Sequence, residues 1–326
     1  MAPWVLEFLY SQFFVTPQYP DYDWNGKTAV VTGSNVGLGY EAVHHLVRLG
    51  ASKVIIACRS LDKGEAAMAK IIAEQKCSPD VLEVWLLDLM SYESVRQFAD
   101  RCKTLPRIDA FVENAGIATR NWFTAEGHES TITTNVVSTF YLALLMIPIL
   151  KQSATKHNIQ PRLVIVSSEV HFLTPFKERK NPKIFDALDS EKLSNMGDRY
   201  NLSKLLEVYV VREWAHKEKY MGSKDYPIIL NMLNPGFCHS ELMREVPTLG
   251  AIVKGLLART SEVGSRTLVH AASAGTETHG EFLSDCKPKT PAKLVVGPEG
   301  PGLQEKFWLE LKDVLEGIQP GITNNF

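Results

Sequence analysis

The chain has 326 residues, of which 45% are apolar and 22% charged, so it is long enough to bury a full hydrophobic core as one large α/β domain or two smaller ones. Its net charge of −2 offers no basic footprint for a polyanion, and we therefore do not expect a nucleic-acid partner. The 5 cysteines are scattered without a C-x-x-C pair, which favours a reducing compartment and disfavours a disulfide framework or a zinc site. We expect a cytoplasmic protein without a metal site.

Two apolar segments need to be distinguished from membrane spans. Residues 4–15 are rich in aromatic side chains, but the segment is short, contains Glu7 and lacks the positive region of a signal peptide. We expect an extra N-terminal helix packed on the body of the protein, with attachment to a membrane surface as the less favoured alternative. Residues 130–150 carry no charge, yet the first half of this segment is too polar to span a bilayer. It is predicted to be a buried helix with Pro148 near its end.

A strand, a glycine-rich turn and a helix follow the N-terminal segment. Residues 28–32 form a short β-branched apolar run, typical of a strand buried on both faces of a parallel sheet. Three glycines come next: Gly33, Gly37 and Gly39. Such a turn lets the backbone approach a pyrophosphate closely, and the N-terminus of the helix that follows offers it unpaired N–H groups. A glycine-rich loop without a ligand is the alternative, but a second strand at residues 53–58 completes a βαβ unit and weakens that alternative.

Strands and helices alternate along the rest of the chain. Further strands are predicted at residues 82–87, 108–112, 162–168, 227–233 and 280–283. Helices are predicted at residues 60–75, 91–102 and 130–150, and from Arg199 onward. This alternation predicts an α/β fold with a single doubly wound Rossmann sheet, parallel and of about seven strands, flanked by helices. We assign residues 1–23 to an N-terminal extension and residues 24–326 to this domain, whose ligand would lie beyond the carboxyl ends of the strands.

Arg59 indicates which dinucleotide is bound. A unit that binds NAD usually places Asp or Glu at the end of its second strand, where the carboxylate accepts hydrogen bonds from the ribose 2′-hydroxyl. Here the second strand ends in Cys58 and Arg59, with no acidic residue. An arginine would instead pair with a 2′-phosphate through charge-assisted hydrogen bonds, so we predict NADP(H). A solvent-exposed arginine at a strand end is the alternative, but it leaves the missing carboxylate unexplained.

Tyr200 and Lys204 form the candidate proton-transfer pair. Residues four apart on a helix lie on one face, so the two side chains should be adjacent. A nearby ammonium and the positive charge of an oxidised nicotinamide both favour the phenolate, which would make Tyr200 usable as an acid or base near neutral pH. A Y-x-x-x-K pattern alone carries little information, because many surface helices contain it. Ser168, at the end of the fifth strand, could donate to a substrate carbonyl, or merely cap the strand.

These residues and several short motifs are similar to those of a known family. The motifs are TGSNVGLG at residues 32–39, Asp88-Leu89, ENAG at residues 113–116, Asn135, Ser168, YNLSK at residues 200–204 and Pro235-Gly236. In this order they resemble the short-chain dehydrogenase/reductase family over residues 24–315. ACRS at residues 57–60 and the long segment between Ser168 and Tyr200 look like the retinol-dehydrogenase and WW-domain-oxidoreductase-like branch, and similar chains occur among fungal natural-product pathway reductases.

The resemblance implies a role for each matching residue. Tyr200 would be the proton donor or acceptor, Lys204 would lower its pKa and bind the nicotinamide ribose, and Ser168 would orient the substrate oxygen. Asn135 would hold a water that links Lys204 to solvent. The NADP(H) site would comprise Gly33, Asn35, Gly37, Leu38, Gly39, Arg59, Asp88, Leu89, Asn114, Gly116, Tyr200, Lys204, Pro235, Gly236 and Ser240. One departure is Glu113, where the family often has Asn; we expect it to change the hydrogen bonding at the strand end but not the chemistry.

Two variable segments are expected to define the substrate site. Residues 170–199 mix aromatic and charged side chains, whereas residues 237–261 have apolar helical spacing in a region that would cover the active site of this fold. We interpret the second segment as a lid over a hydrophobic substrate, with an ordinary packed helix as the alternative. His171 and His239 could touch the substrate, but we expect each to be a surface or loop histidine.

The sequence thus predicts an NADP(H)-dependent oxidoreductase that interconverts a carbonyl and an alcohol on a hydrophobic small molecule, as a ketoreductase or dehydrogenase of secondary-metabolite biosynthesis. A retinol- or steroid-like alcohol dehydrogenase is the alternative within this class, and a non-catalytic NADP-binding regulatory protein is the alternative outside it. The resemblance leaves a homodimer open, formed through the helices of residues 130–150 and 200–216. Contact with a membrane is not expected.

Overall fold

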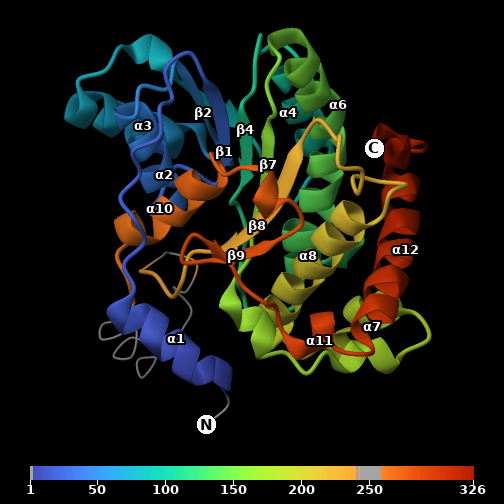
Figure 1. Cartoon of the computed structure of the whole chain (residues 1–326). Coiled ribbons are helices and arrows are strands. Elements are labelled where there is room, and N and C mark those ends of the chain that lie inside the picture. Colours follow the sequence, from blue (N-terminus) through green and yellow to red (C-terminus); the bar gives the residue numbers. More distant parts are fainter. Residues whose placement is uncertain (1–2, 240–241, 243–257) are drawn as a thin grey trace.

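The computed structural model describes residues 3–239, 242 and 258–326. Its centre is a sheet whose strand order is β10-β9-β8-β7-β4-β1-β2-β3 (Figure 1). Seven of these strands are parallel: β1 (Thr28–Thr32), β2 (Lys53–Cys58), β3 (Leu82–Leu86), β4 (Ala110–Glu113), β7 (Arg162–Val166), β8 (Ile229–Asn234) and β9 (Phe282–Ser284). The predicted Rossmann sheet of about seven strands is therefore confirmed. The sequence did not predict β10 (Lys287–Pro288), which pairs antiparallel with β9 at the edge.

Alternate residues of the strands feed two separate hydrophobic layers, as a parallel sheet covered on both faces requires. In β1, Val30 packs on one side and Val31 on the other. One side is covered by α2 (Gly37–Arg48), α3 (Leu61–Gln75) and α10 (Ser261–Ala271), seen at the left of Figure 1. The other side is covered by α4 (Tyr92–Cys102), α6 (Thr139–His157), α8 (Arg199–His216) and α12 (Gly300–Ile318). The core is thus divided by the sheet into two halves.

The apolar segment predicted at residues 130–150 is a buried helical rod with an irregular start. It consists of α5 (Ser130–Ile132), a π-helical turn (Thr133–Ser138) and α6. In the part of the chain that the structure describes, this rod is the one helix long and apolar enough to cross a membrane, but 89% of its most apolar window is buried within the protein. Pro148 lies well inside α6 rather than near its end, because the helix continues to His157. The rod is a core element of the fold.

The last helix and the turn after it pack on the two helices expected to form a dimer surface. Trp308 of α12 packs against Trp214 of α8, with the ring centroids 5.4 Å apart. Beyond α12, a short turn (Ile322–Asn325) covers α6, where Asn325 donates a hydrogen bond to the Leu144 carbonyl. Part of each helix that the sequence suggested for a homodimer is thereby covered within one chain. The homodimer itself stays a prediction.

The remaining elements lie around the carboxyl ends of the strands. The expected N-terminal helix is present as α1 (Pro3–Phe14), and in Figure 1 it lies outside both helical layers. A small hairpin pairs β5 (Thr124–Ala125) with β6 (His128–Glu129), and two short helices, α7 (Ile184–Leu188) and α11 (Lys293–Val296), complete this end. These elements surround the region where the topology predicts a ligand.

Candidate active site

The order in which strands are added to the sheet switches sides between β1 and β4. β1 pairs with β2 on one side and with β4 on the other, so the carboxyl ends of β1 and β4 flank the crevice in which such folds bind ligands. The Thr32 hydroxyl accepts hydrogen bonds from the backbone N–H groups of Asn114 and Ala115, at 3.0 and 2.9 Å. In return, the Asn114 amide donates to the carbonyls of Thr32 and Gly33. The two strand ends are thereby locked together.

Two of the three glycines in the turn, Gly33 and Gly39, leave no room for a side chain. Gly33 has a φ of +63°, and a Cβ there would lie 2.8 Å from the Ala115 Cα. A Cβ at Gly39 would lie 2.7 Å from the Gly33 carbonyl oxygen, so this glycine lets α2 sit directly on the turn. At the start of α2, Val36 provides no side-chain cap for the first N–H groups. An uncapped helix N-terminus beside a close-approach turn fits a pyrophosphate, which would accept those hydrogen bonds.

A cavity of about 970 Å³ extends along the carboxyl ends of the strands. Most of the residues predicted to bind cofactor or substrate line it: Gly33, Asn35, Gly37, Leu38, Arg59, Asp88, Leu89, Asn114, Gly116, Ser168, Tyr200, Lys204, Pro235 and Gly236. Gly39 and Asn135 do not line it and lie behind the wall that they support. Ser240 lies outside the described residues, as does most of the expected lid at residues 237–261, of which Phe237, Cys238 and Leu242 line the cavity.

The end of the cavity near β2 is cationic. Arg59 is exposed, lines the cavity and forms no hydrogen bond or ion pair with any residue that the structure describes. Lys63, in the first turn of α3, lines the same end, and Ser60 caps that helix by accepting from the Lys63 N–H. The sequence interpretation missed Lys63, although it follows the N-cap Ser60 by three residues and so faces the same end of the helix. Two cations whose side chains have no ion pair among the described residues, beside a helix start, fit a phosphate group.

Tyr200, Lys204 and Ser168 meet at the other end of the cavity. The Lys204 ammonium lies 5.7 Å from the centroid of the Tyr200 ring, as the spacing on one helical face predicts. Burial raises the pKa of Tyr200 above its usual value, although the charge of Lys204 and an interaction with the Ser168 hydroxyl both lower it. The negative charge of Glu207 raises it further. In the protein alone, desolvation thus outweighs the ammonium, and the additional bias toward phenolate from an oxidised nicotinamide stays a prediction.

Asn135 is placed by the π-helical turn of the buried rod. Its side chain accepts from the Ile117 N–H at 2.9 Å and donates to the Ile117 carbonyl at 2.9 Å and to the Ser203 hydroxyl at 3.0 Å. These bonds connect the strand end after β4 to α8, the helix that carries Tyr200. A π-helical turn of this kind often occurs at functional sites, because it releases backbone groups from the regular helical pattern.

A buried group of charges lies beneath Lys204. Its ammonium donates to Glu207 at 2.7 Å and to the Val166 carbonyl at 2.9 Å, which leaves one N–H for the cavity. Burial raises the pKa of Glu207 to about 7 despite this ion pair. Glu113, the departure noted at the end of β4, is 4% exposed, and its carboxylate finds no hydrogen-bond partner among the described residues. Burial, reinforced by Glu207, raises its pKa well above the usual value.

The two histidines near the site differ. His171 is fully buried, which contradicts its expected place on the surface or in a loop. Its Nδ1 bonds to the Ser168 carbonyl at 2.7 Å, and its Nε2 accepts from the Ala292 N–H, so the ring is held as a neutral imidazole. Burial lowers its pKa to about 4. His239 is exposed. His171 is therefore a support for the Ser168 backbone.

The fold and this cavity define a dinucleotide-binding α/β protein, and comparisons with known proteins specify its class. A family model described as short chain dehydrogenase matches residues 27–177. The chain is 50% identical over 327 residues to "Short chain dehydrogenase/reductase dmxR8" of Cryptosporiopsis sp. (strain 8999), across 98% of this chain and 99% of the relative. It is 40% identical over 324 residues to "Short-chain dehydrogenase anuD" of Penicillium roqueforti (strain FM164), across 97% and 84%.

A solved structure supports the same fold. The Pseudomonas aeruginosa RhlG/NADP active-site complex superposes with a TM-score of 0.61 at 20% identity, across 82% of this chain and 97% of that chain. Together with the two relatives above, the matched family model shows that the chain belongs to the short-chain dehydrogenase/reductase family of oxidoreductases. Members of this family use NAD(H) or NADP(H) and act on small molecules.

Proposed function

We propose that this protein is an NADP(H)-dependent oxidoreductase that interconverts a carbonyl and an alcohol on a hydrophobic small molecule. The observation that carries the proposal is one continuous cavity: Arg59 and the glycine turn lie at one end, and Ser168, Tyr200 and Lys204 at the other. A dinucleotide that spans this cavity would place its 2′-phosphate near Arg59 and Lys63 and its pyrophosphate at the start of α2. When bound, it supplies or accepts the hydride at the reacting carbon.

The protein's own residues handle the substrate oxygen. The Tyr200 hydroxyl donates a proton to that oxygen in reduction, and the Ser168 hydroxyl donates a hydrogen bond that orients it. The remaining N–H of Lys204 is available to the cofactor ribose or to Tyr200. The same hydroxyl would accept the proton in oxidation, so the residues of the site serve both directions and do not set the working direction.

The biological setting is part of the same proposal. The two relatives come from fungi, and the cavity combines catalytic polar groups with apolar walls. We propose a ketoreductase that acts on an apolar intermediate of secondary-metabolite biosynthesis in the cytoplasm. A retinol- or steroid-like alcohol dehydrogenase remains the second candidate, favoured by the same apolar walls. Purified protein assayed with apolar ketones and with retinol- and steroid-like alcohols distinguishes the two by which class of substrate has the higher kcat/KM.

The nucleotide part is tested by titrating NADPH and NADH into the wild-type protein and following the fluorescence. We expect tight binding of NADPH and weak binding of NADH, because only the former carries the 2′-phosphate that Arg59 and Lys63 would neutralise. Equal binding of both nucleotides would contradict the NADP assignment. Binding of NADPH without turnover of any ketone or alcohol would instead favour a non-catalytic NADP-binding regulatory protein.

A further inference from the structure

The N-terminal helix α1 forms a wall of the cavity that holds the candidate catalytic residues. Trp4, Val5, Phe8 and Leu9 line the cavity together with Ser168 and Tyr200. Positions i, i+1, i+4 and i+5 lie on one face of a helix, so a single apolar face of α1 is turned into the cavity. These side chains are only partly buried, and a bound ligand would cover them. The sequence predicted the helix but gave it no part in the site.

The opposite face of α1 provides an internal reference. Leu6, Tyr10 and Phe13 are 56%, 62% and 56% exposed, and none of them lines the cavity. Phe8 and Phe13 are therefore chemically identical side chains on the same helix, one inside the cavity and the other outside it. If α1 binds the ligand, replacing Phe8 should weaken ligand binding and replacing Phe13 should not.

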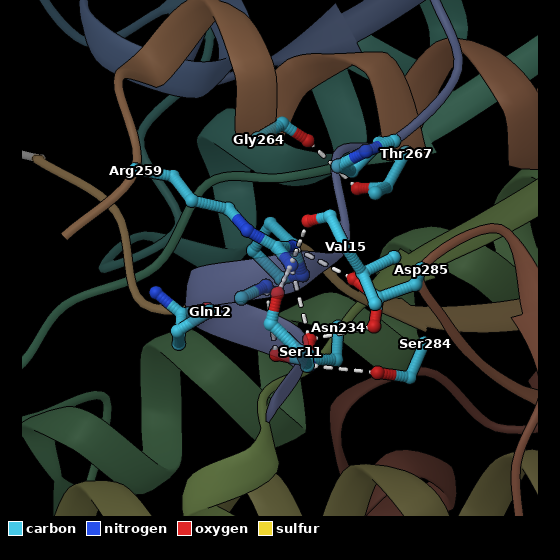
Figure 2. Close-up of polar contacts among 12 residues, drawn as sticks. Ser11, Gln12, Val15, Asn234, Arg259, Gly264, Thr267, Ser284 and Asp285 are labelled. Carbon is cyan, nitrogen blue, oxygen red and sulfur yellow. Dashed lines mark hydrogen bonds and ion pairs between the residues drawn. The ribbon is translucent and has the colours of Figure 1, made fainter. Parts of the chain in front are cut away.

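A buried arginine fixes the carboxyl end of α1 (Figure 2). Arg259 is 7% exposed, and its guanidinium donates to the carbonyls of Ser11 and Val15, at 2.6 and 2.9 Å, and to the Ser11 hydroxyl at 3.0 Å. It also pairs with Asp285 at 2.8 Å, and the Ser11 hydroxyl donates to the same carboxylate. A cation at the carboxyl end of a helix satisfies its free carbonyls and complements its dipole. We call Arg259, Asp285 and Ser11 the α1 clasp.

The clasp connects α1 to the turn that follows β8. The Gln12 amide donates to the Phe237 carbonyl at 3.0 Å and accepts from the Phe237 N–H at 3.1 Å. The backbone N–H of Arg259 donates to the same carbonyl at 2.8 Å. A Cβ at Gly236 would lie 2.7 Å from the Gln12 side-chain oxygen, so α1 rests directly on the Pro235-Gly236 turn, which itself lines the cavity. The position of the wall is thus coupled to the active-site turn.

The amino end of α1 contacts the opposite side of the cavity. The Trp4 ring stacks on Phe172, with the centroids 6.0 Å apart and the planes inclined by 16°. Glu7 lies 3.6 Å from Lys289, which in turn pairs with Glu169 at 2.8 Å. Glu169 directly follows Ser168 in the chain. The helix therefore bridges the segment after β7 and the turn after β8, the two segments that carry Ser168 and Pro235.

We propose that α1 is a substrate-binding wall that takes the apolar ring portion of the substrate, with Trp4 and Phe8 as specificity-determining residues and Arg259 as a positioning residue. The inference rests on the proposed function in placing the reacting carbonyl at Ser168 and Tyr200. Two aromatic side chains one helical turn apart favour a flat, ring-containing ligand, because stacked and edge contacts add to the burial of apolar area. A small ketone would react without touching them.

The first experiment measures binding without turnover. The neutral fluorophore N-phenyl-1-naphthylamine is titrated into wild type, Phe8→Ala and Phe13→Ala, each saturated with NADPH. We expect Phe8→Ala to weaken binding about tenfold and Phe13→Ala to leave it unchanged. Equal affinities of the three proteins would overturn the proposal, whatever their activity. Retained binding differences in a protein that reduces no ketone would instead uphold the wall and reject the proposed carbonyl chemistry.

The second experiment separates specificity from catalysis. Reduction of 2-acetylnaphthalene and of cyclohexanone is compared in wild type, Trp4→Ala, Phe8→Ala and Phe13→Ala. We expect KM for the naphthyl ketone to rise about tenfold in the first two variants at nearly constant kcat, with no change for cyclohexanone. A parallel loss for both ketones would show a general structural effect and contradict a specificity role.

The clasp is tested through Ser11→Ala, since Arg259→Ala would leave the partly buried Asp285 without its ion-pair partner and could prevent folding. Ser11→Ala removes two hydrogen bonds of the clasp and leaves the ion pair in place. We expect the naphthyl-to-cyclohexanone ratio of kcat/KM to fall while the NADPH affinity stays constant. An unchanged ratio would exclude a positioning role for the clasp.

Discussion

The two ends of the cavity are built in different ways. At the nucleotide end, Thr32, Gly33 and Asn114 lie at or just after the carboxyl ends of two adjacent strands, and each belongs to a short sequence motif. At the substrate end, the wall is made by α1, which is held by Arg259 and Asp285 from the last third of the chain. The comparison teaches that the nucleotide site is encoded in short motifs, whereas the substrate site depends on contacts between distant segments.

The largest loss of activity is expected at Tyr200, the proposed proton donor. Tyr200→Phe removes the hydroxyl that would donate the proton, and we expect kcat to fall roughly 10²–10⁴-fold. The NADPH affinity should stay the same, because the aromatic ring and Lys204 are retained. The decrease in NADPH absorbance measures kcat, and fluorescence measures affinity. If Tyr200→Phe retained full activity, proton transfer by Tyr200 would be excluded.

A smaller loss is expected at the nucleotide end. Arg59→Ala removes a cation that has no protein partner in the described chain, so any loss is a loss of ligand contact. We expect NADPH to bind roughly 10- to 100-fold more weakly, since a hydrogen bond to a charged group contributes about 1.5–3 kcal/mol. NADH affinity should not change.

Lys63→Ala is the companion variant to Arg59→Ala. Its ammonium lines the same end of the cavity from the first turn of α3. We expect it to reduce NADPH affinity less, because a lysine acts as a point charge and an arginine can bind phosphate through two hydrogen bonds. If both variants bound NADPH and NADH like the wild type, the 2′-phosphate site would lie elsewhere.

The sequence predicted the fold well for the same reason that it predicted the nucleotide end. Strands such as residues 28–32 and 53–58 are continuous β-branched runs, and the structure places β1 and β2 at those bounds. The side chains of Tyr200 and Lys204 are adjacent as their spacing on one helix requires. Local periodicity and spacing determine these features, so no knowledge of distant contacts was needed.

The missed features all depend on partners far apart in the chain. No local pattern shows that Arg259 meets Ser11, or that Trp308 packs on Trp214 of α8. The burial of His171 follows from Phe172 and Phe282, which enclose its ring. Likewise, the pKa of Tyr200 depends on desolvation by the whole site, which spacing alone cannot reveal.

Glu113 and Glu207 are expected to give the smallest effect. They are far apart in the sequence, and the charge of Glu207 raises the pKa of Glu113. Both are buried, Glu207 pairs with Lys204, and both have a pKa above the usual value, that of Glu207 at about 7. From about pH 4.5 to about pH 7 the folded protein therefore binds more protons than the unfolded chain. Stability contributed by these groups should accordingly fall as the pH rises through this range, which is opposite to the usual behaviour of a salt-bridged carboxylate.

Glu113→Gln replaces the neutral form of this carboxyl by an uncharged group of the same shape. Since the carboxylate has no hydrogen-bond partner among the described residues, the change breaks no bond there. We expect little difference from the wild type at about pH 5 and greater stability at about pH 8, where the wild type must either ionise Glu113 or hold its proton against solvent. Denaturant unfolding at a series of pH values measures the effect, with the exposed Glu65→Gln as control. A parallel pH profile for Glu113→Gln and the wild type would show that Glu113 is ionised at no cost, and that the buried charges beneath Lys204 are balanced in another way.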